Sequence, residues 1–243
     1  MAVFETWLSQ FEAIRPAPGR PLVSLCFAQS LDGCIAQRRG QPTALSGPES
    51  NRLTHRLRAA NDAILIGVGT ILADDPLLTV RLVEGRNPQP VVLDSRLRTP
   101  LEARLLTDNP RPAWIACTPA AEPTRRATLE RRGVTALVLP AGPDGGVDLP
   151  SLLTCLYDKG VHRLMVEGGA SVITSFLAQN LVDWVVLTEA PVFLGGLHAV
   201  EQPSWQSDDS SLRPPRLQIV ESEQMGEDLV ILGRLVRQYR QSA

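Results

Sequence analysis

Short apolar runs recur along the chain, and polar segments separate them. Residues 22–28 and 63–67 form two such runs, and strands that are buried on both faces of a sheet have this pattern. Shorter runs predict further strands at residues 91–94, 113–117, 136–139, 164–167 and 184–188. The core is therefore expected to contain a sheet of several buried strands.

Segments typical of helices lie between these runs. One begins at Pro48, a residue suited to the first turn of a helix, and extends to Ala60. Another covers residues 149–159, with Asp148 as its N-cap and Gly160 beyond its end. Two more are predicted at residues 124–132 and 170–179. Strands that alternate with helices of about ten residues predict an α/β fold with a largely parallel sheet.

The two ends of the chain depart from this alternation. Apolar residues with helical spacing between residues 4 and 11 predict a helix, so residues 1–20 are expected to form a helical extension. Near the other end, two strand patterns at residues 216–222 and 229–236 predict an antiparallel hairpin on the sheet edge. We expect one domain over residues 1–243, with three layers and a predominantly parallel central sheet.

The composition is that of an ordinary globular protein. Hydrophobic residues make up 44% of the chain and charged residues 21%, and 24 Lys and Arg against 26 Asp and Glu give a net charge of −2. An apolar fraction of this size excludes disorder as the main state. The near-neutral balance argues against a nucleic-acid binder.

Location and redox state are also indicated by the sequence. No apolar run reaches the roughly 18 residues of a membrane span, and residues 1–14 lack the basic start of a secretory signal. The four cysteines (Cys26, Cys34, Cys117 and Cys155) and the three histidines lack the spacing of a metal site. We expect a cytoplasmic protein with no membrane partner, no disulfide framework and no bound metal.

Glycines at a strand end are the first candidates for ligand contact. Glu167-Gly168-Gly169 follows one predicted strand and opens the helix that begins at Ala170. Glycine lets backbone amides approach a phosphate, and a helix N-terminus adds favourable partial charge. The alternative is a tight turn that binds nothing. Because a carboxylate repels phosphate, a functional turn requires Glu167 to face a cationic or hydrogen-bond-donating part of a second ligand.

Two further polar clusters follow predicted strands. Ser95 with Arg96 and Arg98 suits a phosphate monoester, such as the 2′-phosphate of a nicotinamide cofactor. Two solvated arginines are the plainer interpretation of that cluster. Asp74-Asp75-Pro76 is expected to form a turn rather than to supply metal ligands.

A series of motifs resembles a known family. In chain order they are Ser30-Leu31-Asp32-Gly33, Leu57-Arg58-Ala59, Asp62-Ala63-Ile64-Leu65, Leu72-Ala73-Asp74-Asp75-Pro76, Leu78-Thr79-Val80-Arg81, Val92-Leu93-Asp94-Ser95 and Val166-Glu167-Gly168-Gly169. Together they resemble the reductase domain of the bacterial riboflavin-biosynthesis protein and its archaeal and fungal stand-alone relatives. The resemblance extends from about residue 22 to about residue 236.

This resemblance implies a dihydrofolate-reductase-like fold and NADPH as the hydride donor. It implies a substrate that is a pyrimidine bearing a phosphoribosylamino group, whose ribosyl C1 is reduced to give a ribityl chain. The family usually forms homodimers, and in bacteria the domain is commonly fused to a zinc deaminase. Because this sequence lacks the deaminase motifs, we expect a homodimeric stand-alone reductase or a paralogue of one.

The resemblance also assigns residues to ligands. NADPH is expected to contact Thr70, Asp74 and Ser95, and its pyrophosphate to contact Gly168, Gly169, Ala170 and Ser171. The substrate is expected to contact Arg58, Leu78, Arg81 and Glu167, with the two arginines suited to its phosphate. Glu167 and Asp32 are the candidate acids for opening the ribose ring, although Asp32 could instead fix its own loop.

The chain departs from the family at three positions near the expected site. Cys34 stands where the family usually has Lys or Arg, and Pro42 and Ala44 stand where relatives carry Ser and Trp. These departures keep two alternatives open. One is a reductase of the same fold that acts on another heterocycle, such as a pterin or dihydrofolate. The other is a non-catalytic NADPH-binding protein, against which the retained Arg58 and Glu167 argue.

Overall fold

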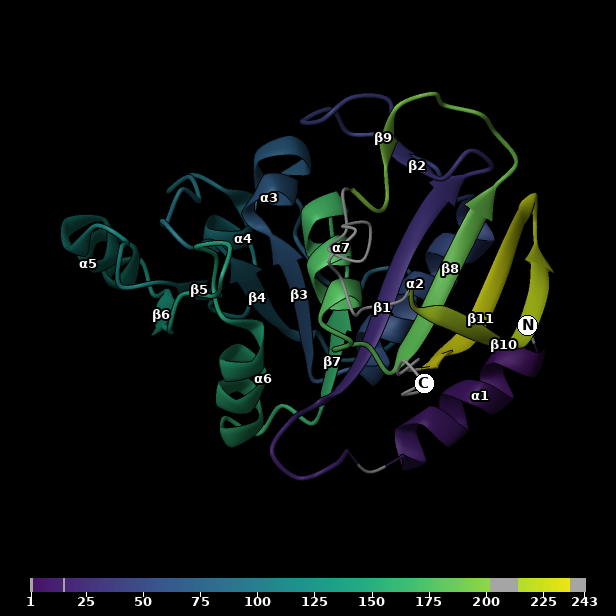
Figure 1. Ribbon diagram of the computed structural model, residues 1–243, viewed down its shortest axis with the longest axis horizontal. Coiled ribbons are helices and arrows are strands. Elements are labelled where there is room, and N and C mark those ends of the chain that lie inside the picture. The colour runs from purple at the N-terminus through teal and green to yellow at the C-terminus, as the bar shows by residue number, and fades with distance from the viewer. Residues whose placement is uncertain (1, 15, 202–213, 237–243) are drawn as a thin grey trace, which may run out of the picture.

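The computed structural model describes residues 2–14, 16–201 and 214–236, and a nine-stranded sheet runs through them (Figure 1). The strand order is β10-β11-β8-β1-β7-β3-β4-β5-β6. The strands of this sheet are β1 (Leu22–Ser30), β3 (Ala63–Gly67), β4 (Gln89–Leu93), β5 (Trp114–Cys117), β6 (Thr135–Val138), β7 (Arg163–Val166), β8 (Trp184–Ala190), β10 (Arg216–Met225) and β11 (Asp228–Val236). A separate small sheet pairs β2 (Cys34–Ala36) with β9 (Leu197–His198).

Helices connect most of these strands. They are α1 (Ala2–Ala13), α2 (Pro48–Ala60), α3 (Val68–Asp74), α4 (Arg104–Thr107), α5 (Pro123–Arg131), α6 (Leu149–Asp158) and α7 (Ala170–Ala178). From β8 to β6 every neighbouring pair of strands is parallel, whereas β11 is antiparallel to both β8 and β10. The predicted α/β fold, with a parallel centre and an antiparallel C-terminal hairpin, is therefore confirmed.

The strand order creates a switch point near the centre of the sheet. β7 lies between β1 and β3, although these two strands precede it in the chain. In open α/β sheets, ligands bind beyond the carboxyl ends of the strands at such a point. A ligand site is therefore expected at the carboxyl ends of β1, β7 and β3.

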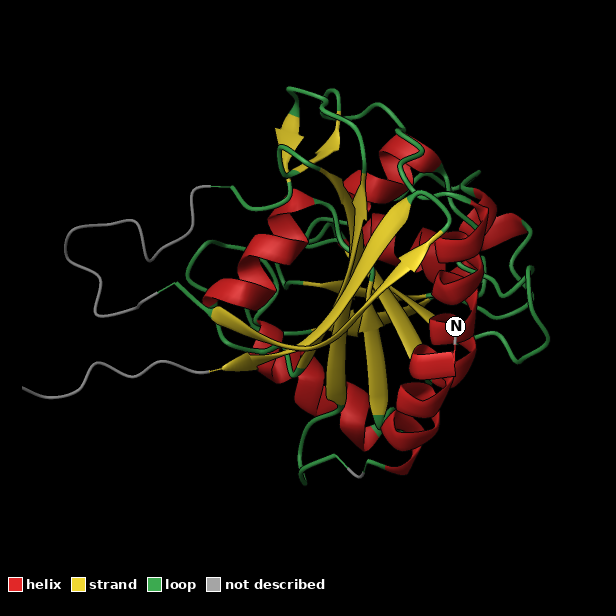
Figure 2. Ribbon diagram, turned by 90° about the vertical axis from the view of Figure 1, so that its right-hand side faces the viewer, coloured by secondary structure: helices red, strands yellow, loops and turns green. Residues whose placement is uncertain are grey.

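Alternate residues of the central strands face two apolar layers. In β3, Ala63 and Leu65 pack with residues of α6 and α7, whereas Ile64 and Ile66 pack with residues of α3, α4 and α5. Figure 2 shows helices on both sides of the sheet. Burial of every β3 residue agrees with the continuous apolar run in its sequence.

The predicted N-terminal helix belongs to the core. α1 buries Phe4, Trp7 and Phe11, and the centroid of the Trp7 ring lies 5.6 Å from that of Trp184 on β8. Leu57 of α2 is part of the same buried cluster. α1 and α2 therefore cover one face of the sheet together.

Four short elements were not predicted: β2, β9, α3 and α4, each of two to seven residues. Segments of this length are too short to show the repeating pattern of hydrophobic and polar positions from which helices and strands are predicted. α3 ends at Asp74, and the φ of 43° at its C-cap Asp75 is left-handed, so the expected turn at Asp74-Asp75 closes a helix. The polar stretch at residues 198–215, with Trp205, lies mostly outside the described residues.

The part of the chain that the structure describes lacks both a membrane-spanning helix and a cluster of metal-ligating side chains. No helix there has the length and apolar character that crossing a lipid bilayer requires. Nor do three or more His, Cys, Asp or Glu side chains gather there in an arrangement that would hold a metal ion.

Candidate active site

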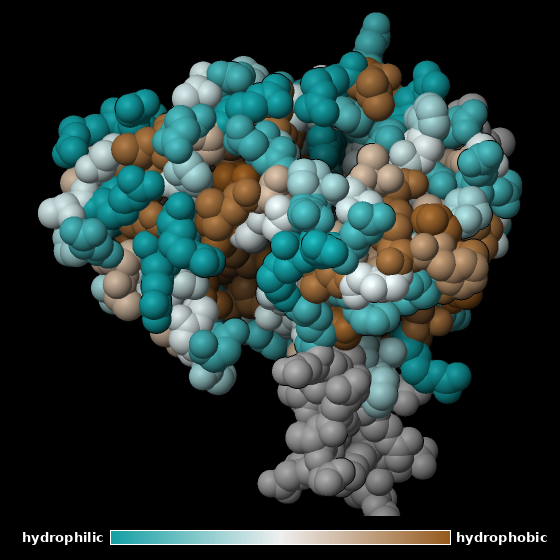
Figure 3. All heavy atoms as spheres, turned by 90° about the horizontal axis from the view of Figure 1, so that it is seen from above, coloured by the Kyte–Doolittle hydropathy of each residue, from teal (hydrophilic) through white to brown (hydrophobic). Residues whose placement is uncertain are grey.

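A cavity of about 820 Å³ lies along the carboxyl ends of the central strands. Its walls come from the ends of β1, β3, β4 and β8, from Glu167 just after β7, from α2 and α3, and from the N-terminal turn of α7. Ile35, Ala36 and Leu197 of the small sheet form what we call its roof. Figure 3 looks onto this end of the molecule, where hydrophobic residues lie between polar ones.

An ion pair lies in the wall of this cavity. Glu167 directly follows β7, and Arg58 is on the last turn of α2. Nε and Nη2 of Arg58 donate to Oε1 and Oε2 of Glu167 at 2.6 Å each. Only 12% of the Arg58 side chain and 19% of the Glu167 side chain are exposed. Burial acts to lower the pKa of Arg58, but the Glu167 carboxylate outweighs burial and the pKa is raised.

The loop after α3 docks on the same face of α2. Nη1 of Arg58 donates to the Thr79 carbonyl oxygen at 3.1 Å, and the backbone N–H of Arg81 donates to His55 Nδ1 at 2.9 Å. The Arg81 side chain is exposed, and Leu78 is buried in the core. Neither lines the cavity. Of the four residues expected at the substrate, the structure therefore brings only Arg58 and Glu167 together in the cavity wall.

Backbone groups form the wall next to Glu167, and we call this part of the cavity the glycine cradle. Its residues are Gly67, Gly168, Gly169, Ala170 and Ser171, and all of them line the cavity. Gly67 and Gly169 are the N-caps of α3 and α7, and no side chain caps either helix. A Cβ on Gly67 would lie 2.8 Å from Val172 Cγ2, and one on Gly168 would lie 3.0 Å from Val172 Cβ. The uncapped N-terminus of α7 leaves amide donors free for an anion.

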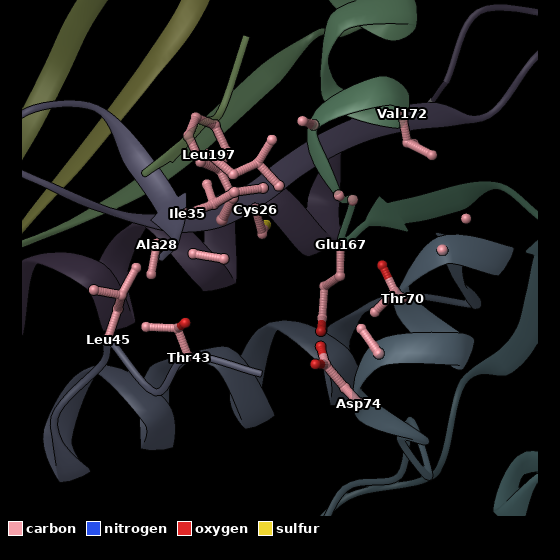
Figure 4. Close-up of a pocket in the computed structure, with 18 of the residues that line it drawn as sticks. Cys26, Ala28, Ile35, Thr43, Leu45, Thr70, Asp74, Glu167, Val172 and Leu197 are labelled. Atoms are coloured by element: carbon pink, nitrogen blue, oxygen red, sulfur yellow. The ribbon is translucent and has the colours of Figure 1, made fainter. Parts of the chain in front are cut away.

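Two polar residues of α3 complete the wall beside the cradle. Thr70 and Asp74 line the cavity, and a Cβ on Gly169 would lie 3.4 Å from Thr70 Oγ1. Figure 4 shows the side chains of Asp74 and Glu167 pointing toward each other. Partial burial raises the pKa of the Asp74 carboxyl group. The sequence-predicted residues Thr70, Asp74 and Glu167 therefore meet in one cavity.

Ser95 and Arg98 lie on a firmly held turn after β4. Oδ2 of Asp94 accepts hydrogen bonds from N and Oγ1 of Thr99 at 2.7 and 2.8 Å. Arg125 donates to two carbonyl oxygens of the same turn. Arg98 lines the cavity, whereas Ser95 does not. Of the three residues in the predicted phosphate-binding cluster, Ser95, Arg96 and Arg98, only Arg98 therefore reaches the cavity.

Asp32 lies outside the cavity wall, in the turn after β1. Its Oδ1 accepts from Ser30 Oγ at 2.5 Å and from the Leu194 amide at 3.0 Å, and its Oδ2 accepts from the Gly195 amide at 2.6 Å. These donors, the Ser30 hydroxyl most strongly, lower the pKa of Asp32. Asp32 joins the turn after β1 to the loop after β8, and a carboxylate so held is a poor proton donor.

The three departures from the family pattern differ in their relation to the cavity. Cys34 is buried, its Sγ accepts from the Gly196 amide at 3.2 Å, and it is not part of the cavity wall. Ala44 lines the cavity and Pro42 does not. Arg38, on the loop after β2, lines the cavity and supplies a positive charge near the roof.

Comparisons with known proteins agree on one family. The family model described as RibD C-terminal domain matches residues 21–231. The 2,5-diamino-6-ribosylamino-4(3H)-pyrimidinone 5′-phosphate reductase of Archaeoglobus fulgidus is 39% identical, over 90% of this chain and 100% of that protein. The riboflavin biosynthesis protein RibD of Aquifex aeolicus is 34% identical, over 87% of this chain and 57% of that protein.

Solved structures agree in fold. A structure of RibD from Acinetobacter baumannii superposes with a TM-score of 0.75, over 90% of this chain and 59% of that chain. Its sequence identity to this chain is 24%. The similarity therefore extends over nearly the whole sheet and its helices.

Proposed function

The chain belongs to the RibD C-terminal domain family of riboflavin-biosynthesis reductases, and we propose that it is an NADPH-dependent enzyme acting in the cytoplasm. Its substrate is a pyrimidine that carries a 5′-phosphoribosylamino group. Hydride addition at ribosyl C1 converts the sugar into an open ribityl chain. The observation that carries the proposal is one cavity that joins the glycine cradle to the partly buried Arg58–Glu167 pair.

The described residues fit a nicotinamide dinucleotide. The free amides of the α7 N-terminus suit the diphosphate, and the missing Cβ atoms of Gly168 and Gly169 let its oxygens approach the backbone. From β1 to β4 the cavity crosses three strand spacings, or roughly 14 Å, which accommodates an extended dinucleotide. When bound, NADPH supplies the hydride, and the chain aligns it with the substrate carbon.

Arg98 supports a preference for NADPH over NADH. It lies at the β4 end of the cavity, and no ion pair or side-chain hydrogen bond of its own occupies it among the described residues. The Asp94 and Arg125 clamps hold its turn rigidly. A guanidinium presented this way matches the 2′-phosphate, whereas Ser95 lies outside the cavity wall.

Glu167 is the group proposed to move protons. Ring opening transfers a proton from the nitrogen attached to C1 to the ring oxygen, which breaks the C1–O bond and leaves a C1=N double bond. The Glu167 carboxylate, paired with Arg58, can accept this proton from the nitrogen and then donate it to the ring oxygen. Hydride then adds to C1, and the nitrogen takes up a proton from solvent.

The other residues assigned to the substrate take supporting roles. Arg58 is fully engaged with Glu167 and Thr79, so it orients Glu167 rather than binding the substrate phosphate. That phosphate falls to Arg81, whose exposed guanidinium lies within electrostatic range of Arg58 and Glu167. Leu78 supports this loop from the core, because the whole residue is only 2% exposed and does not line the cavity. Asp32 fixes the loop beside the roof and donates no proton.

Steady-state turnover tests the proposal against its alternatives. Consumption of NADPH is followed by its absorbance with the phosphoribosylamino-pyrimidine, in both the diamino form and the deaminated form, and separately with dihydrofolate. Turnover of either pyrimidine supports the proposal and identifies the form that is used. Turnover of dihydrofolate alone would establish the alternative heterocycle, and NADPH binding without any turnover would establish a non-catalytic protein.

A homodimer is also part of the proposal. β10 is the terminal strand of the nine-stranded sheet, and Ile219 and Val220 on it are 60% and 50% exposed. An apolar edge strand presents free backbone groups to which a second copy can pair. Sedimentation velocity is expected to give a dimer for the wild type and a monomer for Ile219→Lys. A monomeric wild type would contradict the dimer without affecting the proposed reaction.

A further inference from the structure

A histidine outside the cavity wall is tied to the ion pair inside it. His55 and Arg58 are three residues apart on α2, so they lie on one face of the helix. His55 Nδ1 accepts from the Arg81 amide at 2.9 Å, and Arg58 Nη1 donates to the Thr79 carbonyl at 3.1 Å. One acceptor and one donor of α2 therefore grip a single short backbone segment, residues 79–81.

The His55 ring is suited to act as an acceptor. It is buried, with 5% of the residue exposed. Burial first, and the nearby Arg58 and Arg81 charges next, lower the pKa of His55 to about 4, although the Glu167 charge opposes them. The ring is therefore neutral at neutral pH. Because Nδ1 accepts the Arg81 amide, the ring proton is on Nε2.

This grip bears on the geometry of the active site. The Thr79 carbonyl holds the third nitrogen of Arg58, and the other two nitrogens hold Glu167. If residues 79–81 shift, the guanidinium loses one of its three anchors, and the Glu167 carboxylate turns with it. Misplacement of a reacting group by about 1 Å can cost roughly 100-fold in rate.

We propose that His55 is a positioning residue for the reaction: by holding the Arg81 amide, it fixes the Thr79 carbonyl and thereby the orientation of the Arg58–Glu167 pair. His55 touches neither ligand, since it is not among the residues that line the cavity. The inference rests on the proposed function, because it assumes that this ion pair serves the reductive step.

Three variants test this role. His55→Leu removes the acceptor and keeps an apolar side chain, and His55→Asn keeps an acceptor oxygen close to the position of Nδ1. Phe11→Leu, a buried change in the cluster that also holds Leu57, is the control for lost stability. We expect kcat with the pyrimidine to fall about 10- to 100-fold in His55→Leu and less than about threefold in His55→Asn. Phe11→Leu is expected to lower Tm without changing kcat, and all three variants are expected to bind NADPH with wild-type affinity.

Kinetics can overturn the inference in two ways. Equal loss of kcat in His55→Leu and His55→Asn would mean that the acceptor is not what matters. Equal loss of kcat in His55→Leu and Phe11→Leu at matched Tm would mean that His55 acts only through stability.

An NMR readout separates this inference from the proposed function. In protein labelled with ¹⁵N-histidine, His55 is expected to show the Nε2–H tautomer and no titration from about pH 5 to 8. The Arg81 amide is expected to be protected from hydrogen exchange in the wild type and in His55→Asn, and exposed in His55→Leu. If the wild type does not turn over the pyrimidine, the proposed function fails, and these signals still decide whether His55 holds the segment. Titration of His55 near its ordinary pKa of about 6.5 would overturn the inference. Equal hydrogen-exchange protection of the Arg81 amide in the wild type and in His55→Leu would also overturn it.

Discussion

The Arg58–Glu167 end of the cavity and the glycine cradle present different groups to a ligand. The first offers a charged side-chain pair that is 12% and 19% exposed, and a third residue, Thr79, anchors it. The second offers backbone amides and the space left by missing Cβ atoms. Ligand contact therefore depends on charged side chains in the first part, and on exposed backbone without Cβ atoms in the second.

This difference has consequences for substitution. The ion pair depends on several side chains at once, so changing one member leaves the other charged and poorly paired in a partly buried place. The cradle depends on van der Waals clearance, so even a methyl group at Gly168 presses on α7. Substitutions at the two ends should therefore affect different kinetic constants.

The largest effect is expected from Glu167→Gln. The amide keeps the shape of the side chain but cannot accept and return a proton, so kcat should fall about 100- to 1,000-fold. The NADPH dissociation constant should stay within about twofold, because the cradle is untouched. Stopped-flow single turnovers together with fluorescence titration of NADPH check both values. Full turnover by this variant would remove Glu167 from the chemistry.

A smaller effect, confined to the cofactor, is expected from Arg98→Ala. Loss of a charge-assisted contact to the 2′-phosphate should weaken NADPH binding about tenfold, or about 1.4 kcal/mol, and leave NADH binding unchanged. Arg96→Ala is the matched control, because Arg96 is an exposed arginine on the same turn that does not line the cavity. Equal effects of the two variants would exclude a specific 2′-phosphate contact.

Gly168→Ala probes the cradle itself. The added Cβ would lie 3.0 Å from Val172 Cβ and 3.2 Å from the Ile173 amide nitrogen, so the first turn of α7 must shift. We expect the KM for NADPH to rise several-fold, up to about tenfold, while the KM for the pyrimidine stays the same. A rise in the pyrimidine KM alone would reverse the assignment of the two ends.

The smallest effect on turnover is expected from Asp32→Asn, because Asp32 acts through the loop beside the roof. Its folded pKa is lowered below the unfolded value of about 3.9, so its stabilising effect is complete above that pH. The effect is lost as pH falls toward the folded pKa. Thermal melts should therefore show a lower Tm for the variant at pH 7 and a shrinking difference below about pH 4. A pH-independent difference would contradict this account.

Much of the fold follows from the sequence because its central strands are buried on both faces. Continuous apolar runs such as residues 63–67 predict strands whose structural bounds agree with them. The Pro48 signal likewise predicts the start of α2. The small sheet of β2 and β9 was missed, since two or three residues carry no period and their pairing joins segments about 160 residues apart.

The site residues that could be predicted are the polar residues and glycines that directly follow a predicted strand. Glu167 and the glycines after it follow β7 in the chain, and the motif around Asp74 lies on α3 beside them. Contacts between distant segments were not predictable. The bond between His55 and the Arg81 amide is one such case, because a lone histidine on a helix gives no sign of its partner.

Asp32 had two interpretations from the sequence, a candidate acid or a residue that fixes its own loop. Its motif marks a functional region, but a sequence does not reveal that two amides from the loop after β8 occupy the carboxylate. From the sequence alone, a carboxylate that donates a proton cannot be told from one that only holds a loop, because the Leu194 and Gly195 amide donors are not visible. Glu167 differs from Asp32 in its partner, an arginine inside the cavity wall.

The most direct test of the central claim is hydride tracing. The enzyme is incubated with the phosphoribosylamino-pyrimidine and NADPH that carries deuterium at the transferable position of C4, and the product is examined by NMR. The account predicts one deuterium at C1 of a newly formed ribityl chain, with wild-type enzyme and, far more slowly, with Glu167→Gln. Deuterium on the pyrimidine ring, or its retention in the cofactor, would contradict the account.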